Sequence, residues 1–200
     1  MARSAIEVFD DQIGDAEQML SLARSMLKGP RTGDQGEPPA RALLRQAIVA
    51  AAAAVESYVA VKAAACLPDA LAAKKLPDRL GKLEMPLEKA LTAARGRSPR
   101  SAFQSWAAQA LEDQASADPG VIGAVFSAVG EGKILQRCDS ERMVDRGTSE
   151  RQMKELASRR NQIAHRGDRT AQGRRKLAVN HVETHVRNAR QVAEALEKIL

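Results

Sequence analysis

Arg160 and His165 are the residues of this sequence whose types and spacing best suit acid–base chemistry on a charged substrate. Histidine titrates close to neutral pH and can therefore act as a general base or a general acid. Arginine stays protonated, and its planar guanidinium matches the oxygens of a phosphate group. On a straight α-helix, residues five apart diverge by about 140° around the axis. The two side chains can therefore share one site only if the helix ends near His165, or if the site forms across a dimer axis.

Basic side chains are concentrated around this pair. Residues 151–176 hold nine Lys or Arg and two Asp or Glu, whereas residues 1–130 hold 15 of each kind. The formal net charge of +6 thus comes from residues 131–200. Such a concentration favours a polyanionic partner, although a solvated helix face has the same composition. Aromatic residues make up only 2% of the chain, which disfavours modules that stack RNA bases on aromatic side chains.

The segment LASRRNQIAHRGDR, residues 156–169, resembles the signature of the HEPN superfamily. That signature is an arginine, usually followed by a polar residue, and then a histidine after four to six intervening positions. Here the pattern is formed by Arg160, Asn161 and His165, and the residues on either side look most like the RiboL-PSP branch. The resemblance extends to an alanine-rich helix that carries Glu56 and covers residues 1–66 and 148–200.

The resemblance implies an up-and-down helical bundle. Residues 67–147, which it leaves unmatched, read as short helices separated by proline and glycine, so we expect a single all-α domain over residues 1–200 with these helices inserted in the bundle. The resemblance also implies metal-independent endoribonuclease activity, in which a ribose 2′-hydroxyl attacks the adjacent phosphate. A homodimer that brings two motifs into one cleft is expected with it. Such proteins often belong to toxin–antitoxin or phage-defence systems, so an antitoxin or another partner protein is a further expectation. Some relatives only bind RNA, nucleotide or a partner protein, and this is the alternative function.

Several residues have candidate roles beside the arginine and the histidine, each with a purely structural alternative. Asn161 could orient His165 or bind a phosphate oxygen, or it could cap the helix end. Glu56 could hold Arg160 through a charge-assisted hydrogen bond, or it could face solvent. Arg160 could instead pair with a carboxylate of the core, and His165 could cap a helix end. The other arginines of the basic segment are expected to contact phosphates without reading sequence; they are Arg159, Arg166, Arg169, Arg174 and Arg175.

Apolar periodicity and capping residues predict the elements that must position these side chains. A first helix is expected from Ser4, which has capping-box spacing with Glu7, to Lys28. A second helix is expected over residues 39–66, with one buried stripe of apolar side chains. Asp118, followed by proline, is expected to cap one of the short inserted helices.

The motif helix and a closing helix complete the predicted bundle. Ser149 and Gln152 have capping-box spacing, so the motif helix is expected to begin there. It should end at Arg166-Gly167-Asp168, because glycine favours the conformation that terminates a helix. The closing helix is expected over residues 173–200, and no strand pair is predicted anywhere.

Other chemistries find less support. His181 and His185 have a four-residue spacing that could hold zinc, but no third ligand lies near them in sequence, so no metal is expected. No glycine-rich phosphate loop is present, and no cofactor is expected. Cys66 and Cys138 are isolated from each other, as in a reducing compartment. The longest apolar run, residues 47–55, is shorter than the roughly 20 residues of a membrane span, so the protein is expected in the cytoplasm.

Overall fold

The computed structural model describes residues 3–28, 37–170, 173–174 and 177–200, and it confirms the all-α prediction. The helices, in chain order, are α1 (Ala5–Lys28), α2 (Glu37–Ala72), the 3-10 turn η2 (Leu80–Lys82), α3 (Leu87–Arg95), α4 (Pro99–Gln114), α5 (Pro119–Ala128), α6 (Ile134–Glu141), α7 (Thr148–Arg166) and α8 (Val179–Ile199). Two strands of two residues each, which the sequence did not predict, lie between the last two helices: β1 (Arg169–Thr170) pairs antiparallel with β2 (Gly173–Arg174).

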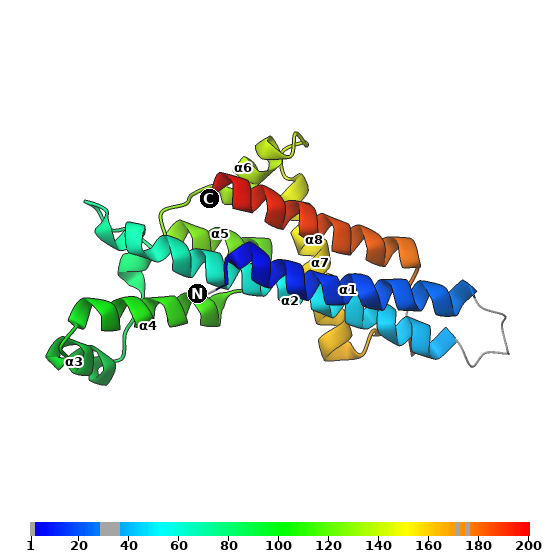
Figure 1. Cartoon of the computed structure of the whole chain (residues 1–200), viewed down its shortest axis with the longest axis horizontal. Helices are drawn as coiled ribbons and strands as arrows, with labels where there is room; N and C mark the ends of the chain where they lie inside the picture. Colours follow the sequence, from blue (N-terminus) through cyan, green and yellow to red (C-terminus); the bar gives the residue numbers. More distant parts are fainter. Residues whose placement is uncertain (1–2, 29–36, 171–172, 175–176) are drawn as a thin grey trace.

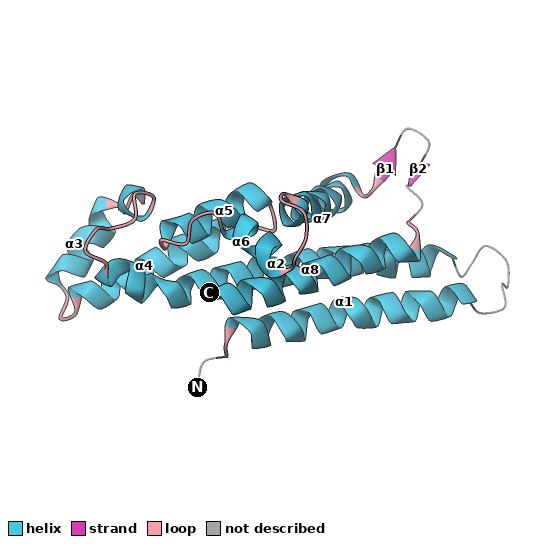
Figure 2. Ribbon diagram, turned by 90° about the horizontal axis from the view of Figure 1, so that it is seen from above, coloured by secondary structure: helices cyan, strands magenta, loops and turns pink. Residues whose placement is uncertain are grey.

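The long helix α2 is the centre of the bundle. It contacts α1, α4, α5, α7 and α8. Figure 1 shows α1 and α2 running antiparallel along the long axis of the molecule, with α8 beside them. Seen from above, α1 lies on one side of α2 and α8, while α5 and α7 lie on the other side (Figure 2). A helix with neighbours on several sides must be apolar around much of its surface, and α2 is rich in buried alanine.

Local sequence signals explain where α1 begins. The Ser4 amide donates a hydrogen bond to Glu7 Oε2 over 2.7 Å, and the Glu7 amide donates to Ser4 Oγ over 3.4 Å. These reciprocal bonds form the predicted capping box, which satisfies amides that have no partner within the helix.

The predicted buried stripe of α2 is confirmed, but its predicted end is wrong. Leu44, Ile48 and Val59 are fully buried. The helix does not stop at Cys66: it continues through Pro68 to Ala72. Proline removes one helical hydrogen bond. The last two turns nevertheless bury Leu67 and Ala70 in the core, and this packing favours continued helix.

By length and composition, α2 could also cross a membrane. The stretch Pro39–Ala72 passes that test, and half of its most apolar window is buried inside the protein. The uninterrupted apolar run of residues 47–55 alone did not predict this candidate. A core helix of a bundle has the same composition, so the expected cytoplasmic location stays a prediction.

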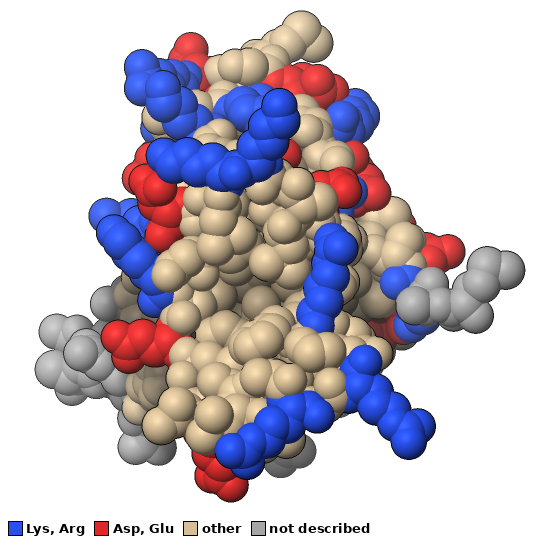
Figure 3. Space-filling view, turned by 90° about the vertical axis from the view of Figure 1, so that its left-hand side faces the viewer, with Lys and Arg blue, Asp and Glu red and all other residues tan. Residues whose placement is uncertain are grey.

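The helices between α2 and α7 contribute to the main core at one end and extend away from it at the other. Leu111, Ile122 and Phe126 join the buried side chains of α2 and α7 in the same hydrophobic cluster. By contrast, α3 packs on α4 and leaves Leu87 and Leu91 exposed. Figure 3 views the molecule from this end and shows Lys and Arg side chains around a broad surface of uncharged residues.

The start of α7 differs from the predicted capping box. Gly147 adopts a left-handed conformation with φ 86°, and the helix begins at Thr148. The Asp139 carboxylate, from α6, accepts hydrogen bonds from the amides of Gly147 and Ser149 over 2.7 and 2.8 Å. The buried Ser149 hydroxyl accepts from Arg142, so this serine does not form a capping box with Gln152. The cap of α7 thus comes from a neighbouring helix.

The closing helix also begins later than predicted. Residues 173–174 form strand β2, and α8 starts at Val179. From there, Val182, Val186 and Val192 are buried against the rest of the bundle. Figure 2 shows the hairpin at the far end of α7, between the motif helix and α8.

Candidate functional site

The motif helix ends immediately after His165, as predicted. Helix α7 stops at Arg166, and the next two residues, Gly167 and Asp168, have φ values of 56° and 58°. The Asp168 amide donates to the carbonyl of Gln162 over 3.1 Å, and the Gly167 amide bonds to the same carbonyl. Glycine tolerates the left-handed conformation best, and aspartate is among the few other residues that adopt it readily. The turn therefore places His165 at the exposed end of the helix.

His165 and Asn161 lie four residues apart on the same face of α7, as neighbours on a helix surface do. Both are exposed, and both line an open groove of about 520 Å³. Lys154 and Ser158 line it from the same helix, and Asp118 lines it from the start of α5. As predicted, Asp118 caps α5, because its Oδ1 accepts from the Gly120 amide over 2.8 Å.

Arg160 lies around the helix from His165 but is connected to the groove. Its Nη1 donates to Asn161 Oδ1 over 3.1 Å. Its Nη2 is 3.8 Å from Glu56 Oε2 on α2, which is an ion pair rather than a hydrogen bond. The two side chains are 34% and 25% exposed. Asn161 thus links the arginine to the groove that holds the histidine, and the Arg160 side chain stays partly exposed.

The most buried charges of the site belong to three residues that are not connected by any local pattern in the sequence. Asp168 accepts a hydrogen bond from Arg45 Nε over 2.9 Å and another from Arg159 Nη2 over 3.0 Å. Arg159 Nη1 is also 2.7 Å from Asp168 Oδ1. The carboxylate is fully buried, and the Arg45 and Arg159 side chains are 9% and 13% exposed. We call Arg45, Asp168 and Arg159 the buried charge cluster.

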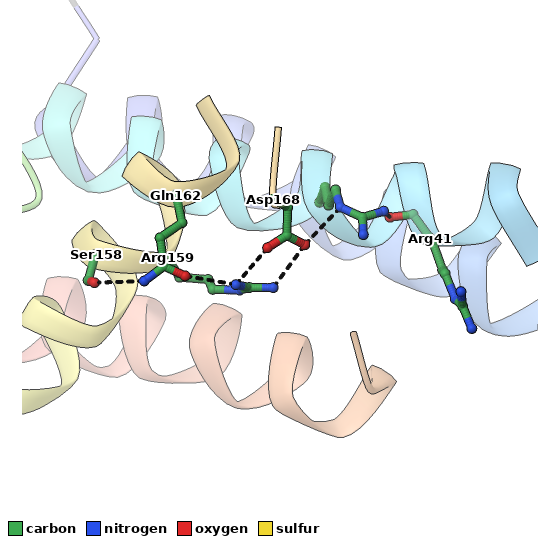
Figure 4. Close-up of polar contacts among 6 residues, drawn as sticks. Arg41, Ser158, Arg159, Gln162 and Asp168 are labelled. Carbon is green, nitrogen blue, oxygen red and sulfur yellow. Dashed lines mark hydrogen bonds and ion pairs between the residues drawn. The ribbon is translucent and has the colours of Figure 1, made fainter. Parts of the chain in front are cut away.

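The buried charge cluster ties the turn after α7 to the middle of the bundle. Figure 4 shows the Asp168 carboxylate between the Arg159 guanidinium and helix α2. Arg159 Nη1 also donates to Gln162 Oε1 over 2.9 Å, and Gln162 Nε2 donates to Ser158 Oγ over 3.4 Å. Arg45 Nη1 donates to the Arg41 carbonyl over 3.2 Å. These contacts hold the last turns of α7, which carry Asn161 and His165.

Of the five arginines predicted to contact phosphate, the structure describes the side chain of Arg159 alone. Arg159 is engaged in the buried charge cluster, so its contact with phosphate stays a prediction that has to compete with Asp168. The side chains of Arg166, Arg169 and Arg174, and the whole of Arg175, lie outside the described residues.

The two histidines of α8 do not gather a third ligand within the described part of the chain, where no group of three His, Cys, Asp or Glu side chains could hold a metal ion. His181 is exposed, whereas His185 is half-buried beside α7. Burial lowers the pKa of His185, and the nearby Glu155 carboxylate partly opposes that effect. Burial likewise raises the pKa of both thiols, Cys66 and Cys138. At neutral pH both cysteines are therefore poor nucleophiles.

No family model, curated protein or solved structure matches this chain. The chemistry of the site therefore has to follow from its own residues.

Proposed function

We propose that this chain is a metal-independent endoribonuclease of the HEPN superfamily. The observation that carries the proposal is the end of α7: Arg160 donates to Asn161, and Asn161 shares an exposed groove with His165. The segment around them is the string RRNQIAHRGD that resembles the family signature. A cytoplasmic location and a role in a toxin–antitoxin or defence system, with a matching partner protein, are parts of the same proposal.

Cleavage without a metal needs three contributions. A base must take the proton of the 2′-hydroxyl, a cation must stabilise the charge that develops on the phosphate oxygens, and an acid must protonate the departing 5′-oxygen. His165 is suited to be the base, and Arg160 is suited to be the cation. Attack of the 2′-oxygen on phosphorus breaks the bond to the 5′-oxygen, so the products are a 2′,3′-cyclic phosphate and a free 5′-hydroxyl.

A second copy of the chain would supply the missing acid. Each groove holds one histidine, and the five-residue spacing turns Arg160 away from His165 within one chain. Two copies related by a two-fold axis would present two His165 side chains to the same phosphate. The first histidine would then take a proton while the second gives one.

Glu56 has a supporting role in this proposal. Its carboxylate lies 3.8 Å from the Arg160 guanidinium and keeps that side chain on the α2 side of the motif helix. Half-buried opposite charges at this distance attract each other without the strength of a hydrogen bond. Phosphate could therefore draw Arg160 away from Glu56 at modest cost.

The test is cleavage of an end-labelled single-stranded RNA in EDTA, with a strand that carries 2′-deoxyribose as substrate control. His165→Ala should lower the rate about 10²–10⁴-fold, the usual contribution of a general acid or base. His181→Ala is the matched protein control, because it removes an exposed histidine from α8. Salt-sensitive RNA binding without any cleavage would instead support the alternative, a HEPN module that binds RNA, nucleotide or a partner protein.

A further inference from the structure

The groove that holds Asn161 and His165 continues along α7 as a stripe of exposed polar side chains. Lys154, Ser158, Asn161 and His165 follow one another at intervals of four, three and four residues. This is the spacing of one helix face, and all four side chains are exposed and line the groove. We call these four residues the polar stripe of α7.

The polar stripe extends one turn further through Arg151. Arg151 precedes Lys154 by three residues and is exposed. With the exposed Glu155, it lines a second open hollow, of about 500 Å³, on the side of α7 that faces His185. Lys154 and Ser158 line both hollows, so the stripe forms a ridge between them.

Lys154 in the polar stripe and Arg151 next to it are free to bind an anion. Within the described part of the chain, neither Lys154 nor Arg151 has a carboxylate within 4.0 Å, whereas Arg159 on the same helix is paired with Asp168. Lys154 lies eleven residues before His165, which is about 16 Å along the helix axis, and Arg151 lies about 21 Å away. A stacked nucleic-acid strand advances about 3.4 Å per phosphate. The stripe thus matches the length of a few nucleotides.

We infer that the polar stripe of α7 is the track of a single RNA strand, with Lys154 and Arg151 binding phosphates several nucleotides away from the one that reaches His165. The inference rests on the proposed function and specifies its substrate as single-stranded RNA several nucleotides long. The phosphates run on the α7 side of the groove, because the Asp118 carboxylate on the opposite wall repels them.

The opposed charges of Lys154 and Asp118 allow a two-sided binding test. The probe is a fluorescent dodecamer of 2′-O-methyl RNA, which lacks the attacking hydroxyl and therefore stays intact. Lys154→Gln should weaken its binding by up to about fivefold, the range of an exposed ion pair. The dependence of log K on log salt should fall by about 0.7, the contribution of one phosphate contact on a single strand. Arg151→Gln should have a similar effect.

Asp118→Asn should change binding in the opposite direction. Asparagine is as good an N-cap as aspartate, so the start of α5 is retained while the negative charge is removed. The dodecamer should then bind more tightly. Lys89→Gln is the matched control. Lys89 is exposed on α3, far from the groove, so removal of its positive charge should leave binding unchanged.

Substrate length separates the track from a general effect of charge. A dinucleotide has one phosphate and cannot reach Lys154 from His165. On unmethylated RNA, Lys154→Gln should raise KM for a dodecamer, leave its kcat unchanged, and leave cleavage of a dinucleotide unchanged. Equal losses on both substrates, or equal binding by Lys154→Gln, Lys89→Gln and wild-type protein, would overturn the inference. Binding of the dodecamer that depends on Lys154, without cleavage of any RNA, would retain the track and reject the ribonuclease.

Discussion

Replacing Asp168 by asparagine should destabilise the protein far more than replacing a surface aspartate. Asp168 is fully buried between Arg45 and Arg159, whose side chains are 9% and 13% exposed. Asparagine keeps the size of the side chain and tolerates the left-handed backbone that Asp168 adopts at φ 58°. The substitution therefore removes the negative charge and leaves the turn intact.

The magnitude follows from the two ion pairs. With the charge centres about 4 Å apart and an effective dielectric constant of about 20, each pair is worth about 4 kcal/mol before the cost of desolvation. Breaking a buried pair by removing one partner costs roughly 3–5 kcal/mol, because the remaining charge loses its compensation. Both guanidiniums keep some contact with water, so we expect about 3 kcal/mol. For a chain of this size, that loss lowers Tm by roughly 6–12 °C.

Urea denaturation of wild-type, Asp168→Asn and Asp11→Asn proteins measures this difference. Asp11 pairs with Arg3 over 3.1 Å, but the two side chains are 69% and 55% exposed, so the control should lose less than about 1 kcal/mol. The slope m should be the same for all three proteins if the substitutions change only stability. Equal stabilities of Asp168→Asn and Asp11→Asn would refute the role assigned to the buried charge cluster.

Three further predictions concern groups with shifted pKa values. Burial, and then the Glu197 carboxylate 3.0 Å away, raise the pKa of Tyr58, so tyrosinate absorbance should stay absent at about pH 11 until the protein unfolds. The stability that the protonated Tyr58 contributes is present below about pH 10, the ordinary tyrosine pKa, and is lost above it. The pKa of His185 is lowered in the folded protein, so the unfolded chain binds a proton at this residue more tightly, and stability should fall as pH drops below about 6.5. In urea denaturation at several pH values, His185→Gln should show a smaller fall in stability than His181→Gln. The buried Cys138 thiol, whose pKa is raised by burial, should react with iodoacetamide only in urea, as mass spectrometry of briefly treated protein would show.

Local sequence patterns correctly predicted those helix ends that are stabilised by residues close together in the chain. The capping box of Ser4 and Glu7 is formed by residues three apart, and the cap of Asp118 reaches amides two and three residues on. The cap of α7 was mispredicted, because the amides at its start donate to the Asp139 carboxylate of a different helix and not to a local capping box. The end of α2 was mispredicted for a similar reason: packing of Leu67 in the core overrides the local effect of Pro68.

The candidate site was predictable only in part for the same physical reason. The glycine after the motif correctly predicted the end of α7, since a left-handed residue terminates a helix. Asp168, the next residue, was treated only as part of that break. Its partner Arg45 lies 123 residues earlier, and no local pattern connects the two. Burial next to two arginines is a property of the assembled bundle.

The pair Arg159-Arg160 shows that a count of charges along the chain does not give the charge that is available to a ligand. Adjacent residues on a helix point about 100° apart. One arginine of the pair therefore turns inward to Asp168, and the other reaches Asn161 and Glu56. The local excess of positive charge includes a guanidinium that is already compensated inside the protein. Since only cations without an internal partner can attract a polyanion at low cost, RNA binding should depend on Lys154 more than on Arg159, which directly precedes the motif.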